Sequence, residues 1–292
     1  MGMAGLALAC IAAILYGILE AEKKRATVFF DIKIIFWALV TVAAPVFAVL
    51  LALQGIPSID QRFWIVICID TPLLIFTNIL FIKAEKISPI STALPLLSFT
   101  PVFLIATSFF ILGELPNTYG IIGIFLVVLG ALALKGEDLR NRFRHPLSSI
   151  LADKGSRYIL LIAFIWSFNA NFSKLAIEFS SVWFYLFISY TLEAIFMNIW
   201  LYAKHRDELR FIHHTPLGLL LTAAVTNILA AVFFMVALQD TLVSYVITLK
   251  RAGLMLGGLV LGALVFKEKH VAYRIGGVIL MLAGVVCIMV FH

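Results

Sequence analysis

Long apolar runs, each about as long as a bilayer is thick, alternate along the chain with short charged or turn-forming breaks. A hydrocarbon core of about 30 Å requires about 20 apolar residues per helix. The runs lie near 1–20, 34–54, 62–82, 89–111, 117–135, 157–177, 181–203, 215–238, 242–266 and 271–291. Their length and their internal Pro and Gly residues predict an all-α integral membrane protein with ten transmembrane helices.

The composition excludes several classes of protein. Of the 292 residues, 63% are apolar and 13% are charged, which is more apolar surface than a soluble globular fold can bury. The sequence contains no phosphate-binding Gly-x-x-x-x-Gly-Lys-Ser/Thr loop, no His-Glu-x-x-His motif and no close Cys/His set. It therefore predicts no enzyme, no metal and no other cofactor. Its basic residues sit in short connections, which argues against nucleic-acid binding.

Lysine and arginine are unevenly shared between the two sides of the membrane. Connections after the first, third, fifth, seventh and ninth runs carry Lys23, Lys24, Arg25, Lys83, Lys86, Lys135, Arg140, Arg142, Arg144, Lys154, Arg157, Lys204, Arg206, Arg210, Lys267 and Lys269. The opposite side carries Arg62 and Lys174. Cytoplasmic connections are enriched in Lys and Arg, so the charge distribution predicts a multi-pass cell-membrane protein with both termini outside.

The chain repeats itself. A shift of 154 aligns Glu114 with Glu268, Tyr119 with Tyr273, Gly123 with Gly277, Leu126 with Leu280 and Gly130 with Gly284, and a shift of 150 aligns Tyr16-Gly17 with Trp166-Ser167. We therefore expect two five-helix repeats, 1–135 and 157–292, joined by a polar connection, 136–156. Because five is odd, the second repeat enters the membrane in the opposite sense, which is typical of secondary transporters.

Matched interrupted helices are the best sequence pointer to a transporter binding site. The run 89–111 contains Pro89, Pro95 and Pro101, and its counterpart 242–266 contains Gly253, Gly257, Gly258 and Gly262. We expect these two runs to be interrupted. Two alternatives stay open: the prolines only kink their helix, and the glycines only allow close helix packing.

Four ionisable residues lie well inside apolar runs, where each would cost about 2.5–3.5 kcal/mol if it faced lipid. They are Asp70, Glu193, Lys250 and Arg251. Arg251 shares a helix face with Ser244 and Thr248, and a basic pair suits a carboxylate or phosphate. Alternatively, the two bases and two acids pair and hold their helices together. Asp70 is a counter-ion or a proton-carrying acid, and Glu193 is a similar group or a structural carboxyl.

Other polar residues complete the candidate site. Asn169 shares a face with Trp166 and Ser173, and either presents an amide to a ligand or forms an interhelical hydrogen bond. Ser98, in the proline-containing run, is a further candidate. Glu114 and Glu268 lie in turns, where capping and interhelical bonding explain them.

The sequence resembles the EamA-type domain of the drug/metabolite transporter superfamily. The resemblance rests on Ala84-Glu-Lys-Ile-Ser-Pro through Pro95, Pro101-Val-Phe, Leu112-Gly-Glu114 and Tyr119-Gly-x-x-Gly123 to Gly130, and again on Phe266-Lys-Glu268 to Gly277 and Gly284. It implies a ten-helix inverted-repeat carrier that moves metabolites, amino acids or drugs by alternating access. It also implies cytoplasmic termini, in conflict with the charge distribution, so the orientation stays open.

One branch of the superfamily bears on the substrate. Thr248-Leu-Lys250-Arg251 is similar to the basic pair with which sugar-phosphate and nucleotide-sugar carriers contact phosphate. Leu96 and Leu97 stand where those carriers would have another basic residue. The resemblance therefore implies an anionic substrate more directly than a phosphorylated one.

We expect a secondary transporter that exports or exchanges a small anionic or zwitterionic metabolite. Its expected partners are that small molecule, membrane lipids and a coupling proton or counter-substrate, and homodimer formation stays open. The alternative is a flippase for a lipid-linked or phosphorylated lipid headgroup.

Overall fold

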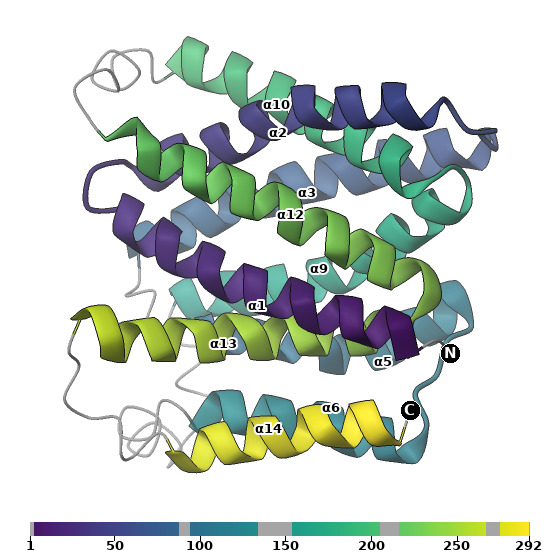
Figure 1. Cartoon of the computed structure of the whole chain (residues 1–292), viewed down its shortest axis with the longest axis vertical. Coiled ribbons are helices and arrows are strands. Elements are labelled where there is room, and N and C mark those ends of the chain that lie inside the picture. The colour runs from purple at the N-terminus through teal and green to yellow at the C-terminus, as the bar shows by residue number, and fades with distance from the viewer. Residues whose placement is uncertain (1–2, 88–93, 134–153, 205–215, 267–274, 292) are drawn as a thin grey trace.

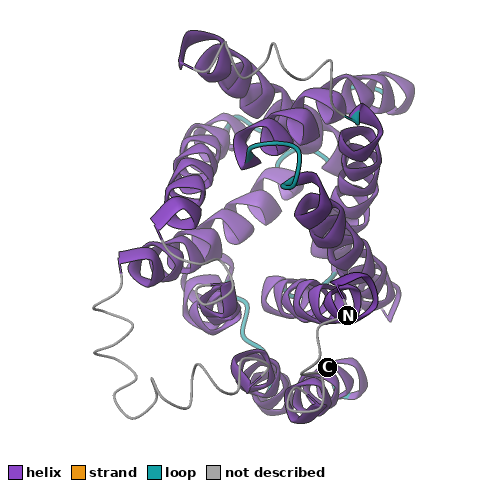
Figure 2. Cartoon of the chain, turned by 90° about the vertical axis from the view of Figure 1, so that its left-hand side faces the viewer, coloured by secondary structure: helices purple, strands orange, loops and turns teal. Residues whose placement is uncertain are grey.

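The computed structural model describes residues 3–87, 94–133, 154–204, 216–266 and 275–291, in which every regular element is a helix (Figures 1 and 2). The first half contains α1 (Met3–Ala26), α2 (Ile32–Gln54), α3 (Arg62–Ile87), the 3-10 helix η1 (Leu94–Phe99), α5 (Thr100–Leu112) and α6 (Thr118–Ala133). The second contains α9 (Lys154–Glu178), α10 (Val182–Lys204), α12 (Leu217–Asp240), α13 (Val243–Phe266) and α14 (Ile275–Val290). Most of the predicted polar connection, Pro89 and Glu268 lie outside the described residues.

Six of the described helices are long and apolar enough to cross a bilayer: α1, α2, α3, α9, α10 and α12. The segment Leu96–Leu112, α6 and α14 are shorter apolar helices. The fold is that of an all-α, multi-pass membrane protein. The full set of ten spans stays a prediction.

The main helix pairings follow the repeat: each of these pairings in which helices of the two halves meet has a counterpart formed by the matching helices (Figure 1). The sequence repeat matches α1 with α9, α3 with α12, and the η1–α5 pair with α13. In the structure α1 packs along α12 and α13, and α9 packs along α3, α5 and η1. The remaining pairings, α2 with α10 and α6 with α14, join matched helices to each other.

The two runs that were expected to be interrupted differ in the structure. In the described part of the run 89–111, the 3-10 helix η1 passes directly into the α-helix α5 at Thr100, with Pro101 in the first turn of α5. The expectation for 242–266 is wrong, because α13 is one continuous helix. Glycine keeps the backbone N–H that proline lacks, so the helical hydrogen bonds of α13 persist. Gly258 and Gly262 lie where only the backbone is described.

The glycines of α13 instead let α1 approach closely. A Cβ atom on Gly17 would lie 2.7 Å from the carbonyl oxygen of Gly253 and 3.2 Å from the Cα of Gly257. This contact confirms the close-packing alternative for Gly253 and Gly257. It also places the middle of α13 directly against α1.

The loop between α2 and α3 contacts the end of α9. The backbone N–H of Asp60 donates to the carbonyl of Phe179 at 2.9 Å, and the Arg62 guanidinium lies 4.4 Å from the centre of the Phe179 ring. Hydrogen bonds from Arg62 lower the pKa of Asp60 to about 2, so this exposed carboxylate stays charged at neutral pH.

The described ends of the chain lie close together in both views (Figures 1 and 2).

Glycines matched by the repeat also hold α6 against α14. A Cβ atom on Gly284 would lie 2.6 Å from the carbonyl oxygen of Gly123, and one on Gly130 would lie 2.7 Å from that of Gly277. The order of these contacts makes the two helices antiparallel. Helices in lipid have no hydrophobic driving force for association, so close van der Waals packing between small residues holds these two helices together.

We expect Gly284→Ala to lower the free energy of unfolding of the purified protein by about 1–3 kcal/mol, because the new methyl group meets backbone that cannot move aside. Gly276→Ala, in the same helix, is the matched control because a Cβ atom at that position would have nothing within 4 Å. It should be neutral or stabilising by up to about 1 kcal/mol. Equal melting curves for the two variants in detergent would contradict this packing.

Candidate functional site

The basic pair of α13 lies at the centre of the helix assembly and points in two directions. Lys250 is half-buried and Arg251 is 6% exposed. Consecutive helical residues project about 100° apart. One side chain therefore reaches α1 and α12 while the other reaches α5 and α9.

Lys250 is held by aromatic faces. Its Nζ lies 3.9 Å from the centre of the Tyr16 ring on α1 and 4.3 Å from that of Phe234 on α12. The two rings meet edge to face, with centroids 5.9 Å apart. Cation–π attraction grows when water is excluded, so these rings stabilise the ammonium without neutralising it.

Arg251 combines one aromatic face with one hydrogen bond. Its Cζ lies 4.9 Å from the centre of the Trp166 ring on α9, and Nη2 donates to the hydroxyl of Thr100 at 3.3 Å. Thr100 is the first residue of α5 and directly follows the last residue of η1. The Trp166 indole is itself fixed, because it donates to Thr77 on α3 at 3.0 Å. Arg251 Nε is buried and has no hydrogen-bond partner among the described residues.

The two repeats each provide one of these aromatic faces. Tyr16 and Trp166 occupy equivalent positions under the shift of 150. The sequence shows that these two positions correspond, but it does not predict that their rings contact the basic pair, nor does it predict the role of Phe234.

The four intramembrane charges do not pair with one another. Among the described residues, the ion pairs join Lys23 to Glu20, Lys33 to Asp31, Arg62 to Asp60 and Lys174 to Glu114. Neither Lys250 nor Arg251 is in ion-pair contact with Asp70 or Glu193. The alternative in which these charges hold the helices together is therefore wrong for this conformation.

The hydroxyl groups predicted around the basic pair are all buried, with different environments. Thr248 donates to the carbonyl of Ser244 at 2.6 Å, so that hydroxyl bonds back to its own helix. Ser98, in η1, has a buried Oγ without a hydrogen-bond partner among the described residues. Ser98 therefore has free hydrogen-bonding capacity where η1 passes into α5.

Asp70 belongs to a separate polar cluster between α3, α9 and α10. The amide of Asn169 donates to its Oδ1 at 2.8 Å, and the hydroxyl of Tyr185 lies 2.9 Å from its Oδ2. Ser173 in turn lies 2.7 Å from the Tyr185 hydroxyl. Asn169 thus makes the interhelical hydrogen bond that was one of its two predicted roles. Tyr185 was missed, because an isolated tyrosine in an apolar run carries no distinguishing pattern.

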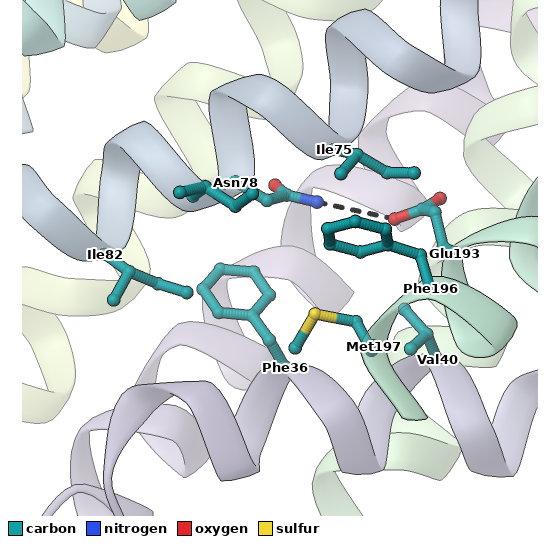
Figure 3. A pocket seen from close by; sticks show the side chains of 9 residues that line it. Phe36, Val40, Ile75, Asn78, Ile82, Glu193, Phe196 and Met197 are labelled. Atoms are coloured by element: carbon teal, nitrogen blue, oxygen red, sulfur yellow. Dashed lines mark hydrogen bonds between the residues drawn. The ribbon is translucent and has the colours of Figure 1, made fainter. Parts of the chain in front are cut away.

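Glu193 lines a small pocket between α2, α3 and α10 (Figure 3). Its carboxylate oxygens are each 3.4 Å from a donor, Asn78 Nδ2 on α3 and Ser189 Oγ on its own helix. The rest of the lining is apolar and comes from Phe36, Val40, Ile75, Ile79, Ile82, Phe196 and Met197. The pocket is too apolar to bind a charged metabolite, and Glu193 fits the structural alternative.

Comparison with known proteins gives a clear family assignment. The sequence model of the EamA-like transporter family matches residues 3–135 and again residues 153–290. The chain belongs to the EamA-like transporter family. This EamA-like protein therefore contains two family repeats, as the sequence predicts, and it is a membrane transporter. No curated protein matches the chain.

A solved structure supports the fold of this EamA-like transporter. A crystal structure described only as that of a "protein" superposes on this chain with a TM-score of 0.69. The two sequences are 15% identical, and the match covers 97% of this chain and 94% of the other chain. At this identity the likeness shows the fold alone. Substrate and mechanism have to be argued from the side chains.

An ion pair joins three segments at the end of the EamA-like transporter where the chain termini lie. Lys174 on α9 forms an ion pair with Glu114, which follows α5, and donates to the carbonyl of Thr241 at 3.0 Å. The second Glu114 oxygen accepts from the backbone N–H of Val243, at the start of α13, at 3.0 Å. The predicted capping and interhelical role of Glu114 is confirmed. That of Glu268 lies outside the described residues.

We expect Glu114→Gln or Lys174→Met alone to destabilise the transporter by about 3 kcal/mol, because each leaves a largely buried charge without its partner. The double variant should cost clearly less than the sum of the single variants. A double-mutant cycle from melting curves measures this coupling. Additive effects would show that the two side chains act independently.

Proposed function

We propose that this membrane transporter is a secondary active carrier with ten spans in two inverted five-helix repeats. The support is the exchange of helix pairings between the halves and the reciprocal contacts of Gly123 with Gly284 and Gly130 with Gly277. Inverted repeats allow a central site to open alternately to each side when the halves exchange conformations. Alternating access at the cell membrane is the mechanism we assign.

The proposed substrate is a small anionic or zwitterionic metabolite, moved outward or in exchange. One observation carries this proposal: the buried Arg251 guanidinium has an Nε without a partner and no carboxylate within ion-pair distance among the described residues, and the charge of Glu20 acts on it only from farther away. A buried cation without an anion is costly, and a guanidinium fork matches a carboxylate or a phosphate. A substrate anion at Arg251 would remove that cost.

The neighbouring groups fit the same role. Lys250 adds a second positive charge that aromatic rings hold without neutralising. The hydroxyls of Ser98 and Thr100 lie where the 3-10 helix η1 passes into α5. We assign Arg251 as the primary contact and Lys250 as a mobile second charge.

The test is thermal stabilisation of the purified protein by amino acids, organic acids, sugar phosphates and lipid headgroups, with and without Arg251→Met. A ligand at about one hundred times its Kd stabilises the folded state by about 2.7 kcal/mol. We expect at least one water-soluble anion to stabilise the wild type and to lose this effect in Arg251→Met.

Arg62→Met is the matched control, since it removes the same charge from a 66% exposed side chain far along the sequence from α13. It should respond to the ligand as the wild type does. Stabilisation that survives in Arg251→Met would make the basic pair structural. Stabilisation by lipid headgroups alone would indicate a flippase.

A further inference from the structure

Asp70 in α3 is a buried acid with hydrogen-bond partners but no cation. Its side chain is 1% exposed, and its carboxyl oxygens contact the amide of Asn169 and the hydroxyl of Tyr185. The helices packed against α3 here are α9 and α10, and the other titratable group that they bring near Asp70 is Glu193, which is also acidic. Among the described residues no positive charge contacts Asp70.

Three contacts of hydrogen-bond length form a chain that starts at Asp70. The distances are 2.9 Å from Asp70 Oδ2 to the Tyr185 oxygen, 2.7 Å from there to Ser173 Oγ, and 2.8 Å from Ser173 Oγ to the carbonyl oxygen of Asn169. Each contact needs one proton to be a hydrogen bond. Tyr185 and Ser173 supply one each, and the carbonyl supplies none.

A charged Asp70 therefore leaves the chain one proton short. Two hydroxyl protons then serve three contacts, and one pair of oxygen atoms faces each other without a hydrogen between them. Such an arrangement is unfavourable in a dry interior, where oxygen lone pairs repel and water cannot intervene. Only a third proton makes all three contacts hydrogen bonds.

We propose that Asp70 is a proton-binding site, and that it holds its proton in this conformation. Asp70 then donates from Oδ2 to Tyr185, Tyr185 donates to Ser173, and Ser173 donates to the carbonyl of Asn169. The amide of Asn169 still donates to Oδ1. Each of the four oxygen atoms in the chain then has a hydrogen-bond partner, whereas the side-chain oxygen of Asn169, which lies outside the chain, has none among the described residues.

This site deepens the proposed function, on which its role in transport rests. When the carrier opens toward water, the O–H bond of the Asp70 carboxyl breaks, the bonding electrons stay on the carboxylate, and the proton passes to water. Reprotonation from the other side returns the carrier to the conformation described here. Under this proposal, the proton is the ion that drives transport.

The experiment is infrared difference spectroscopy of the purified transporter alone, titrated with acid and base and then transferred to D₂O. We expect a protonated-carboxyl C=O band at neutral pH that disappears at high pH and shifts on deuterium exchange. Asp70→Asn should lack this band, because its amide can donate to Tyr185 but cannot bind a proton. Melting curves confirm that the variant folds.

Two further variants separate Asp70 from other acids. Tyr185→Phe should move the band to higher frequency, because the acid loses its acceptor, whereas Glu193→Gln should leave the Asp70 band in place. A wild type without an Asp70-dependent band would overturn the proposal. So would a band that neither titrates nor exchanges, because such an acid never reaches water. The result does not depend on any metabolite, so it stands apart from the ligand screen.

Discussion

A buried polar group inside a bilayer finds no water, so the protein itself has to supply its partner. The helix assembly is organised around this requirement. Positive charges near the middle of α13 rest on aromatic rings, and the acid of α3 is surrounded by amide and hydroxyl groups. Because the two kinds of charge are kept apart, each is available for the role proposed for it, an anion site at Arg251 and a proton site at Asp70.

Close helix packing makes these partners reach one another. Tyr16 can lie over Lys250 because Gly17, Gly253 and Gly257 bring α1 and α13 almost backbone to backbone. Helices in lipid gain little from burying apolar side chains against each other, so the approach depends on small residues. The same glycines that shape the packing therefore set the distance between the ammonium and its ring.

The sequence predicted the apolar runs, the two repeats and the family, because these depend on hydropathy and spacing. The predicted run 181–203 is close to α10, Val182–Lys204. It did not predict that 242–266 stays a single helix, since glycine spacing is compatible with both interruption and close packing. Nor did it predict the partners of the charges, because an apolar run shows where a helix lies but not which way it is rotated against its neighbours.

Two contacts differ in how far they could have been foreseen. The repeat relates the positions of Tyr16 and Trp166, but it does not predict that both rings face α13, because the counterpart of the α1–α13 pairing is the packing of α9 on η1 and α5. The junction of Lys174 with Glu114, Thr241 and Val243 brings together segments 60 to 129 residues apart. Only the three-dimensional packing shows that the Lys174–Glu114 ion pair connects these segments.

The cation–π contacts of Lys250 and Arg251 have an electrical consequence. A carboxylate partner would cancel these charges, whereas a ring leaves the charge whole. An elementary charge that crosses the full membrane potential changes its energy by about 2.3 kcal/mol per 100 mV. In the proposed alternating-access cycle, the empty carrier would move these charges through part of the membrane potential, whereas a bound anion would offset them. Under that proposal, the membrane voltage acts differently on the loaded crossing and on the empty return.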